Sequence, residues 1–203
     1  MKKYVIMANG QGKRWNNFTD RPKHLIEVNG ETLLARIARL LHKFDKQAEI
    51  IISSSNPQYE VVGARRYKPL HDKLELDRFT YELIEDSTCF LYGDTYYSEA
   101  VIEEIVKTNH QKGLLFFGTE KRIVAIKVYE GELMKRHFNL VKELFLAGKT
   151  TDCKGWDIYK SYCQQDFQQR AKLEKDYILI SDETRDFNYP EDYLTFIGEQ
   201  SLA

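Results

Sequence analysis

Short apolar runs recur along the chain and predict a series of buried strands. Tyr4–Ala8, Ala48–Ser53 and Thr88–Tyr92 are each nearly continuous apolar runs that end at turn-forming residues. Such runs favour strands that are buried on both faces, as in a parallel sheet. The same pattern predicts further strands at Gly113–Gly118, Arg122–Tyr129 and Tyr177–Ile180.

Longer segments between these strands have the periodicity of amphipathic helices. In Thr32–Phe44 the leucines and isoleucine recur at helical spacing. Further helices are predicted at Leu76–Ile84, Ser98–Thr108, Glu132–Ala147 and Pro190–Ile197, whereas 58–75 is irregular and 148–176 is weakly patterned. Strands that alternate with helices indicate an α/β fold. We therefore expect a single Rossmann-like domain over 1–203, with a mostly parallel twisted sheet flanked by helices.

The composition narrows the class of protein. The 203 residues carry 30 Lys and Arg against 31 Asp and Glu, a net charge of −1. This balance argues against a nucleic-acid or anionic-membrane binder that works by bulk charge. No apolar run is long enough for a transmembrane helix. Three cysteines and five histidines form no zinc-ligand spacing, and an odd number of cysteines fits a reduced, cytoplasmic location.

The charge is divided unevenly along the chain. Residues 1–24 have a net charge of +5, so the remaining residues sum to −6. A neutral protein with a cationic first segment could use that charge to bind one anionic ligand.

The loop after the first strand has the composition of a phosphate-binding loop. It contains Asn9, Gly10, Gln11, Gly12, Lys13, Arg14 and Trp15. The two glycines allow a ligand close to the backbone, and their amides can point at phosphate oxygens. Trp15 stands where the dinucleotide-binding fingerprint needs a small residue, and Met7 stands where a P-loop needs its first glycine. An ordinary strand–turn connection is the alternative.

Three further places carry polar groups that such a site could use. Lys23 follows Pro22 and lies within phosphate reach if the loop folds back over the strands; otherwise this is a solvated basic turn. Asp94 directly follows a buried strand, where it could hold Mg²⁺ or merely cap the next helix. Asp186 and Asn188 lie on one side of an extended segment and could face the same metal.

Together these motifs resemble the nucleotidyltransferases that join an NTP to a sugar phosphate or a small alcohol phosphate. VIMANGQGKRW is similar to the family's strand followed by G-x-G-x-R-hydrophobic, and RPKHLIEVNGETLL to its P-K-x-L…G-x-P stretch. LYGDTYY resembles the internal G-D, and DFNYPEDY the closing D-x-[DN]-T-P-E-D. The short chain is most similar to the choline-phosphate cytidylyltransferases, with the molybdenum-cofactor guanylyltransferase-like group as near neighbours.

The resemblance implies a GT-A-like nucleotidyltransferase fold and a reaction. An acceptor phosphate would attack the α-phosphorus of an NTP, with CTP favoured, and pyrophosphate would leave. Arg14 and Lys23 would be catalytic, and Asp94 and Asn188 would hold Mg²⁺, with Asp186 as an alternative or additional ligand. The nucleotide would be bound by Ala8, Asn9, Gly10, Gln11, Gly12, Lys13, Arg14, Lys23 and Gly93. The family's products suggest a role in polysaccharide or glycoconjugate precursor synthesis.

The resemblance also implies a division of the chain. Residues 1–112 would bind the nucleotide, 113–185 the acceptor, and 186–193 would close the metal site. The partners would be small molecules, with neither nucleic acid nor membrane, and a homodimer is possible. The acceptor pocket carries no motif; candidate lining residues are Arg65, Arg66, Lys127, Trp156, Tyr159 and Tyr162. Trp156 with nearby tyrosines could cage a quaternary ammonium.

Two other classes stay open at this point. A GT-A-like glycosyltransferase would usually have Asp-x-Asp at the strand end, where this chain has Asp94, Thr95 and Tyr96. Release of pyrophosphate and not of a nucleoside diphosphate separates the two reactions. A non-catalytic nucleotide-binding module would have little use for Arg14, Lys23 and Asp94 together.

Overall fold

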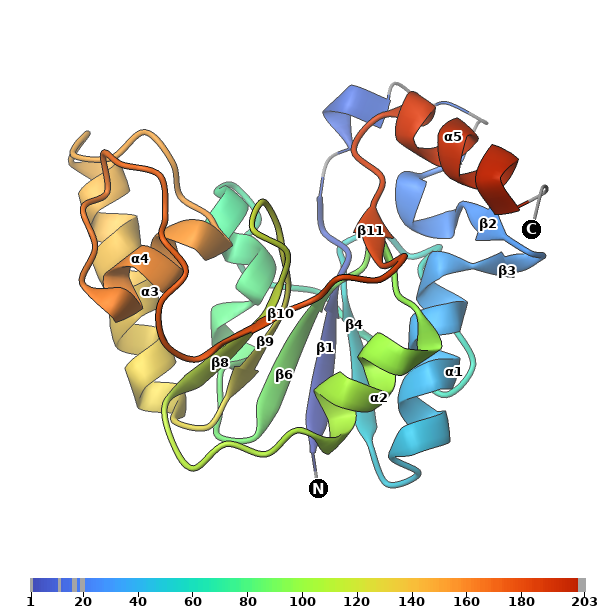
Figure 1. Cartoon of the computed structure of the whole chain (residues 1–203), viewed down its shortest axis with the longest axis horizontal. Helices are drawn as coiled ribbons and strands as arrows, with labels where there is room; N and C mark the ends of the chain where they lie inside the picture. Colours follow the sequence, from blue (N-terminus) through green and yellow to red (C-terminus); the bar gives the residue numbers. More distant parts are fainter. Residues whose placement is uncertain (1, 11, 16–17, 19–20, 201–203) are drawn as a thin grey trace.

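A seven-stranded mixed sheet forms the centre of the molecule (Figure 1). The computed structural model describes residues 2–10, 12–15, 18 and 21–200. The strand order is β10-β8-β9-β6-β1-β4-β5. Their bounds are β1 Lys3–Met7, β4 Glu49–Ser53, β5 Arg65–Tyr67, β6 Thr88–Tyr92, β8 Leu114–Gly118, β9 Ile123–Val128 and β10 Tyr177–Leu179. Strand β9 runs antiparallel to both its neighbours, and the other pairs are parallel.

Helices cover both faces of this sheet because successive side chains of each strand point in opposite directions. Tyr4 and Ile6 of β1 belong to a core that contains the apolar faces of α1 (Leu33–Phe44) and α2 (Glu99–Lys107). Val5 and Met7 belong to the opposite core, which contains α3 (Gly131–Leu146) and α4 (Gly155–Cys163).

A third, smaller core lies beyond the carboxyl ends of the strands. There α5 (Pro190–Gln200) packs through Phe196 against Trp15, Ile26 and Phe187. Two short antiparallel pairs complete this region: β2 (Glu27–Val28) with β3 (Glu31–Thr32), and β7 (Thr95–Tyr96) with β11 (Arg185–Asp186). Figure 1 shows β11 and α5 above the end of β1 that is farther from the N-terminus. The closing segment of the chain is therefore folded back over the loop that follows β1.

Most of the predicted elements are confirmed, and the fold class is the predicted α/β class with a mostly parallel sheet. The helix predicted at Leu76–Ile84 is wrong. Two short 3₁₀ turns, η4 (Glu75–Phe79) and η5 (Tyr81–Leu83), stand there, separated by Thr80 in the left-handed region at φ 45°. The hydroxyl of Thr80 hydrogen bonds with that of Ser53 at the end of β4, which fixes this break against the sheet.

Two elements lie in segments that the pattern left unassigned. Strand β5 is a three-residue edge strand within 58–75, and α4 lies within 148–176. Within the described ranges, no helix is long and apolar enough to cross a membrane.

Candidate active site

The loops that follow β1, β4 and β6 meet at one edge of the sheet. The three strands end in register, since Met7 pairs with both Ser53 and Tyr92. The amide of Ala8 donates to the carbonyl of Ser53 at 3.0 Å, and the amide of Gly93 donates to the carbonyl of Met7 at 2.9 Å. The chain therefore leaves all three strands at the same level, where parallel α/β sheets bind ligands.

Gly93 is required by packing. A Cβ atom on this residue would lie 2.9 Å from the carbonyl oxygen of Met7 and 3.1 Å from the side chain of Leu34. Only glycine lets the turn after β6 pass this close to β1. Gly93, Asp94 and Asp186 are all absent from the linings of the two pockets described below. The turn places Asp94 beneath Lys23, which lines both pockets.

Lys23 and Asp94 form a buried ion pair at this edge of the sheet. Their side chains are only 8% and 10% exposed. Burial acts to raise the pKa of Asp94, but the charge and hydrogen bond of Lys23, together with His24 and Arg78, outweigh it, and the pKa lies below its ordinary value. A buried pair of opposite charges is stabilised only while both partners are present. Asp94 is therefore held in its charged form, with Lys23 as its partner.

Lys23 stands on a short turn that a buried histidine anchors. The turn η3 (Lys23–Leu25) contains His24, whose Nδ1 lies 3.0 Å from the hydroxyl of Tyr59 on the loop after β4. Burial lowers the pKa of His24 to about 4, with the charges of Lys23 and Arg78 acting in the same direction and Asp94 opposing them. A neutral His24 therefore fixes the Lys23 turn to the loop after β4.

The closing segment reaches the site through a chain of polar contacts. Arg14 donates to the side-chain oxygen of Asn188 at 3.1 Å, and Asn188 donates to Asp186. Asp186 is also paired with Arg122 on the turn between β8 and β9. Burial raises the pKa of Asp186, and the negative charge of Asp94 adds to this effect while Arg122 opposes it.

Pairing between β7 and β11 brings the two carboxylates to one place. Asp186 lies opposite Thr95, and the amide of Phe187 donates to the carbonyl of Asp94 at 3.1 Å. Asp94, Asp186 and Asn188 thus carry hard oxygen atoms near the glycine-rich loop, and of the three only Asn188 lines a pocket with it. Mg²⁺ commonly binds through one or two carboxylates together with substrate phosphates. Among the described residues, no group of three or more His, Cys, Asp or Glu side chains is placed to hold a metal ion.

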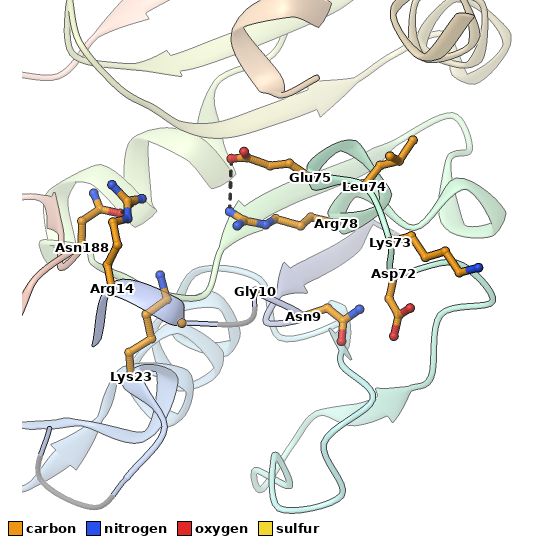
Figure 2. A pocket seen from close by; sticks show the side chains of 11 residues that line it. Asn9, Gly10, Arg14, Lys23, Asp72, Lys73, Leu74, Glu75, Arg78 and Asn188 are labelled. Carbon is orange, nitrogen blue, oxygen red and sulfur yellow. Dashed lines mark hydrogen bonds and ion pairs between the residues drawn. The ribbon is translucent and has the colours of Figure 1, made fainter. Parts of the chain in front are cut away.

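Two adjoining pockets open over the Lys23–Asp94 pair. The first, which we call the phosphate pocket, measures about 340 Å³ and includes Gly10, Gly12, Arg14, Lys23 and Asn188. The second, the base pocket, measures about 480 Å³ and includes the loop after β4. Both are lined by Asn9, Gly10, Gly12, Lys23 and Asp72. Figure 2 shows Arg14, Asn188 and Lys23 at one side of the phosphate pocket and Asn9 and Asp72 at the other.

Most of the nucleotide-binding residues expected from the sequence line these pockets. Ala8 lines the base pocket, and the other pocket residues among them are Asn9, Gly10, Gly12, Arg14 and Lys23. Gln11 lies outside the described residues. Lys13 belongs to the short turn η1 (Lys13–Trp15), and its side chain is likewise outside what the structure describes.

Sequence reasoning missed the residues that the segment 55–78 brings to the site. The guanidinium of Arg78 would lie 3.6 Å from a Cβ on Gly10, and Glu75 pairs with Arg78 at 3.6 Å. Asp72 lines both pockets and accepts from the hydroxyl of Ser55 at 3.4 Å. These residues belong to a stretch without a motif, so no local signal identified them.

The residues that were expected to line an acceptor pocket lie in different parts of the fold. Lys127 caps the end of α2, because its ammonium donates to the carbonyls of Ile105 at 2.8 Å and of Thr108. Arg65 pairs with Glu49 at the sheet edge. Trp156 lines a separate pocket beside α4.

No protein-family model and no curated protein sequence matches the chain. Solved structures do match its fold. The CTP:phosphocholine cytidylyltransferase of Streptococcus pneumoniae is 13% identical with a TM-score of 0.62, and the match covers 98% of each chain. A 4-diphosphocytidyl-2C-methyl-D-erythritol synthase from Anaerococcus prevotii is 13% identical with a TM-score of 0.63, covering 99% of this chain and 98% of that one.

A third similar structure comes from a different nucleotide class. A putative glucose-1-phosphate thymidylyltransferase from Bacillus anthracis is 17% identical with a TM-score of 0.62, covering 98% of this chain and 94% of that one. The chain therefore has the fold of the nucleotidyltransferases, over nearly its whole length, which confirms the fold that the sequence motifs implied.

Proposed function

We propose that this protein is a nucleotidyltransferase that transfers an NMP from an NTP to a small phosphorylated acceptor and releases pyrophosphate. The observation that carries the proposal is the buried Lys23–Asp94 pair, which lies under a glycine-rich loop and beside the closing Asp186–Asn188 segment. The fold that the chain shares with solved nucleotidyltransferases supports it.

In the proposed reaction an oxygen of the acceptor phosphate attacks the α-phosphorus of the NTP in line with the departing pyrophosphate. A new P–O bond forms to the α-phosphorus while the bond from that phosphorus to the bridging oxygen breaks. The acceptor phosphate is already ionised, so the step needs positioning and charge stabilisation more than a general base.

The residue roles in this proposal are those that the family resemblance implies. The backbone amides of Asn9–Gly12 and the guanidinium of Arg14 bind the β- and γ-phosphates. The ammonium of Lys23 turns from Asp94 to the α-phosphate, where negative charge builds up in the transition state. Asp94 is then free to act with Asn188 and Asp186 as an oxygen ligand. Mg²⁺ held by these residues would supply further charge neutralisation at the phosphates.

The base pocket supports a nucleotide whose base carries an amine. The side-chain oxygen of Asn9 accepts a hydrogen bond from the backbone amide of Ser55 at 3.0 Å. The side-chain NH₂ group of Asn9 is therefore the group that can donate to a ligand. The carboxylate of Asp72 lines the same pocket and accepts hydrogen bonds. One donor and one acceptor match the exocyclic amine and ring nitrogen of cytosine, and adenine presents the same two groups. Two of the similar structures are enzymes whose names specify CTP or a cytidylyl product, so CTP is the favoured substrate.

The test is a pyrophosphate-release screen of four NTPs against sugar 1-phosphates and small alcohol phosphates, with and without Mg²⁺. The proposal predicts pyrophosphate release that needs both an NTP and an acceptor. A parallel assay supplies nucleotide sugars as donors, and release of a nucleoside diphosphate from them, with no pyrophosphate from the NTPs, would instead identify a glycosyltransferase of related fold. NTP binding without turnover across the whole panel would identify a non-catalytic module.

A further inference from the structure

A separate pocket lies beside the amino end of α4. It measures about 560 Å³ and is enclosed by the β8–β9 turn, the start of α4 and the segment 167–171. We call it the α4 pocket. Its lining carries four cations, Lys121, Lys154, Lys160 and Arg170, against two carboxylates, Glu120 and Asp152. Two aromatic residues, Trp156 and Phe167, also line it.

Hydrogen bonds between the walls hold the α4 pocket in shape. The indole N–H of Trp156 donates to the carbonyl of Lys121 at 3.3 Å, and Arg170 donates to the carbonyl of Glu120 at 3.3 Å. The ammonium of Lys160 donates to the carbonyl of Phe167 at 3.1 Å, and this lysine is only 8% exposed. Each contact joins two of the three walls. A cavity that is already ordered loses less entropy when it binds a ligand.

The charges of the α4 pocket favour an anion. Lys154 is paired with Asp152 at 3.0 Å, and Lys160 lies 3.5 Å from Asp157. Lys121 and Arg170 also line the pocket, and neither has a carboxylate partner among the described residues. A guanidinium binds a carboxylate or phosphate through parallel hydrogen bonds.

The aromatic residues do not form a cage for a cation. Trp156 stacks on Tyr177 with ring centroids 5.9 Å apart and an interplanar angle of 9°, and it meets Tyr159 edge to face at 5.9 Å. These rings close on one another and do not surround an open space. A quaternary ammonium needs open aromatic faces and is repelled by neighbouring cations. Trp156 lines the pocket beside these cations, and an indole can pack against the apolar C–H face of a sugar ring.

The α4 pocket shares no lining residue with the phosphate and base pockets, but residues beside it contact the candidate active site at two points. Lys121 directly precedes Arg122, which pairs with Asp186. Gly155 packs against the end of β6, since a Cβ there would lie 2.7 Å from the hydroxyl of Tyr92. Tyr92 stands two residues before Asp94. A ligand that occupies the α4 pocket would therefore extend from the acceptor side of the site.

We infer that the α4 pocket binds an acidic group on the part of the acceptor that is distant from its reacting phosphate. The acceptor is then an acidic sugar phosphate and not a quaternary ammonium compound. This inference rests on the proposed nucleotidyltransferase function, because that function makes the adjoining site an acceptor site.

The test compares two probes that differ by one carboxylate, glucuronic acid 1-phosphate and glucose 1-phosphate. Binding is followed by tryptophan fluorescence of the full chain, and Trp156→Phe identifies the contribution of Trp156. We expect glucuronic acid 1-phosphate to bind roughly three- to tenfold more tightly. We expect the double variant Lys121→Gln with Arg170→Gln to remove this preference. Lys121→Arg retains the positive charge and should keep the preference. Lys46→Gln on the remote α1–β4 turn is the control and should leave it unchanged.

Each result decides between the alternatives. Equal affinity for the two probes, no Trp156 response to either, or a preference that survives the double substitution overturns the inference. If pyrophosphate release is observed without any preference for the acidic probe, the inference fails and the proposed function stands. If the acidic probe is preferred through Lys121 and Arg170 but no NTP is turned over, the proposed function fails and the anion-binding pocket remains.

Discussion

Lys23 and Asp94 lie 71 positions apart in the chain and form an ion pair that is nine-tenths buried. One partner stands on the turn after the glycine-rich loop and the other at the carboxyl end of β6. An ion pair this deep is costly to desolvate, and hydrophobic groups often stabilise a fold better. In our proposal the pair is kept because both charges have a use when an NTP is bound.

Replacing Lys23 removes the charge that we assign to the α-phosphate. We expect Lys23→Ala to lower kcat about 100-fold or more, because one preorganised electrostatic contact is lost in the transition state. Steady-state kinetics with CTP and the best acceptor measure this change. Since Asp94 is left unpaired, the variant also loses a few kcal/mol of stability, about 3. A chemical denaturation curve measures that loss of stability, so that it can be separated from the loss of activity. Turnover like that of the wild type would disprove the role of Lys23.

Replacing Asp94 tests the metal assignment. Asp94→Asn keeps the size of the side chain but removes the negative charge that a hard cation needs. We expect activity to fall steeply and its dependence on Mg²⁺ concentration to shift to much higher concentrations. Glu191→Gln in the first turn of α5 serves as the control and should leave the Mg²⁺ titration unchanged. An unaltered titration in Asp94→Asn would place the metal elsewhere.

Substitution of Asp72 tests the choice of base. In the proposal its carboxylate accepts a hydrogen bond from the amine of cytosine, whereas an asparagine could donate to the corresponding oxygen of uracil. Asp72→Asn should therefore reduce the ratio of CTP to UTP affinity about tenfold, measured by calorimetric titration. Glu75 lines the phosphate pocket but not the base pocket, so Glu75→Gln is the matched control. The same ratio in both variants would exclude Asp72 from base selection.

The buried His24 predicts how stability depends on pH. Its pKa is about 4 in the folded protein and about 6.5 when exposed. Between these values the unfolded chain binds a proton that the folded protein does not, so stability is lost as the pH falls. From pH 7 to pH 5 we expect a loss of about 2 kcal/mol from this residue.

The measurement is urea denaturation at both pH values for the wild type and for His24→Gln. The charged groups around His24 are Lys23, Arg78 and Asp94, and all three remain in the variant. His71→Gln, at an exposed position, is the control and should behave like the wild type. A wild-type stability that does not fall more than that of His24→Gln would show that His24 is not buried in its neutral form.

The contact between Gly93 and β1 predicts the effect of one added methyl group. Gly93→Ala forces a Cβ to within 2.9 Å of a backbone oxygen that the sheet holds in place. We expect a loss of about 2 kcal/mol of unfolding free energy and a displaced Asp94. Gly198 in α5 has open space around it, so Gly198→Ala should leave the protein equally or slightly more stable. Equal stability of the two variants would contradict this account of Gly93.

The pattern of apolar and polar residues predicted the strands and the candidate residues at their ends. It did not predict which residues from elsewhere in the chain contact those candidates. The apolar run before Gly93 and Asp94 marks a buried strand, so the position of Asp94 at the ligand edge follows from the sequence. Its pairing with Lys23 depends on how the loop after β1 folds back, and no local pattern records that. Asp72 and Arg78 reach the site because Thr80 and Ser53 hold η4 and η5 against the sheet.

Helix α4 was missed for a different reason. Its buried side includes Asp157, Lys160 and Ser161 together with Ile158 and Tyr159. Buried polar groups are acceptable when they find partners, as the ammonium of Lys160 does at the carbonyl of Phe167. They also remove the contrast between apolar and polar positions on which helix prediction depends. The α4 pocket could therefore be found only from the structure.

The most direct test of the proposed function follows the phosphates of the nucleotide. CTP labelled at the α-phosphate and CTP labelled at the γ-phosphate are each incubated with the protein, Mg²⁺ and the acceptor found in the screen. The account predicts that the α-label enters the acceptor product and the γ-label leaves as pyrophosphate, with both processes slowed about 100-fold or more in Lys23→Ala. An α-label that leaves in a nucleoside diphosphate, or no transfer of either label, would contradict it.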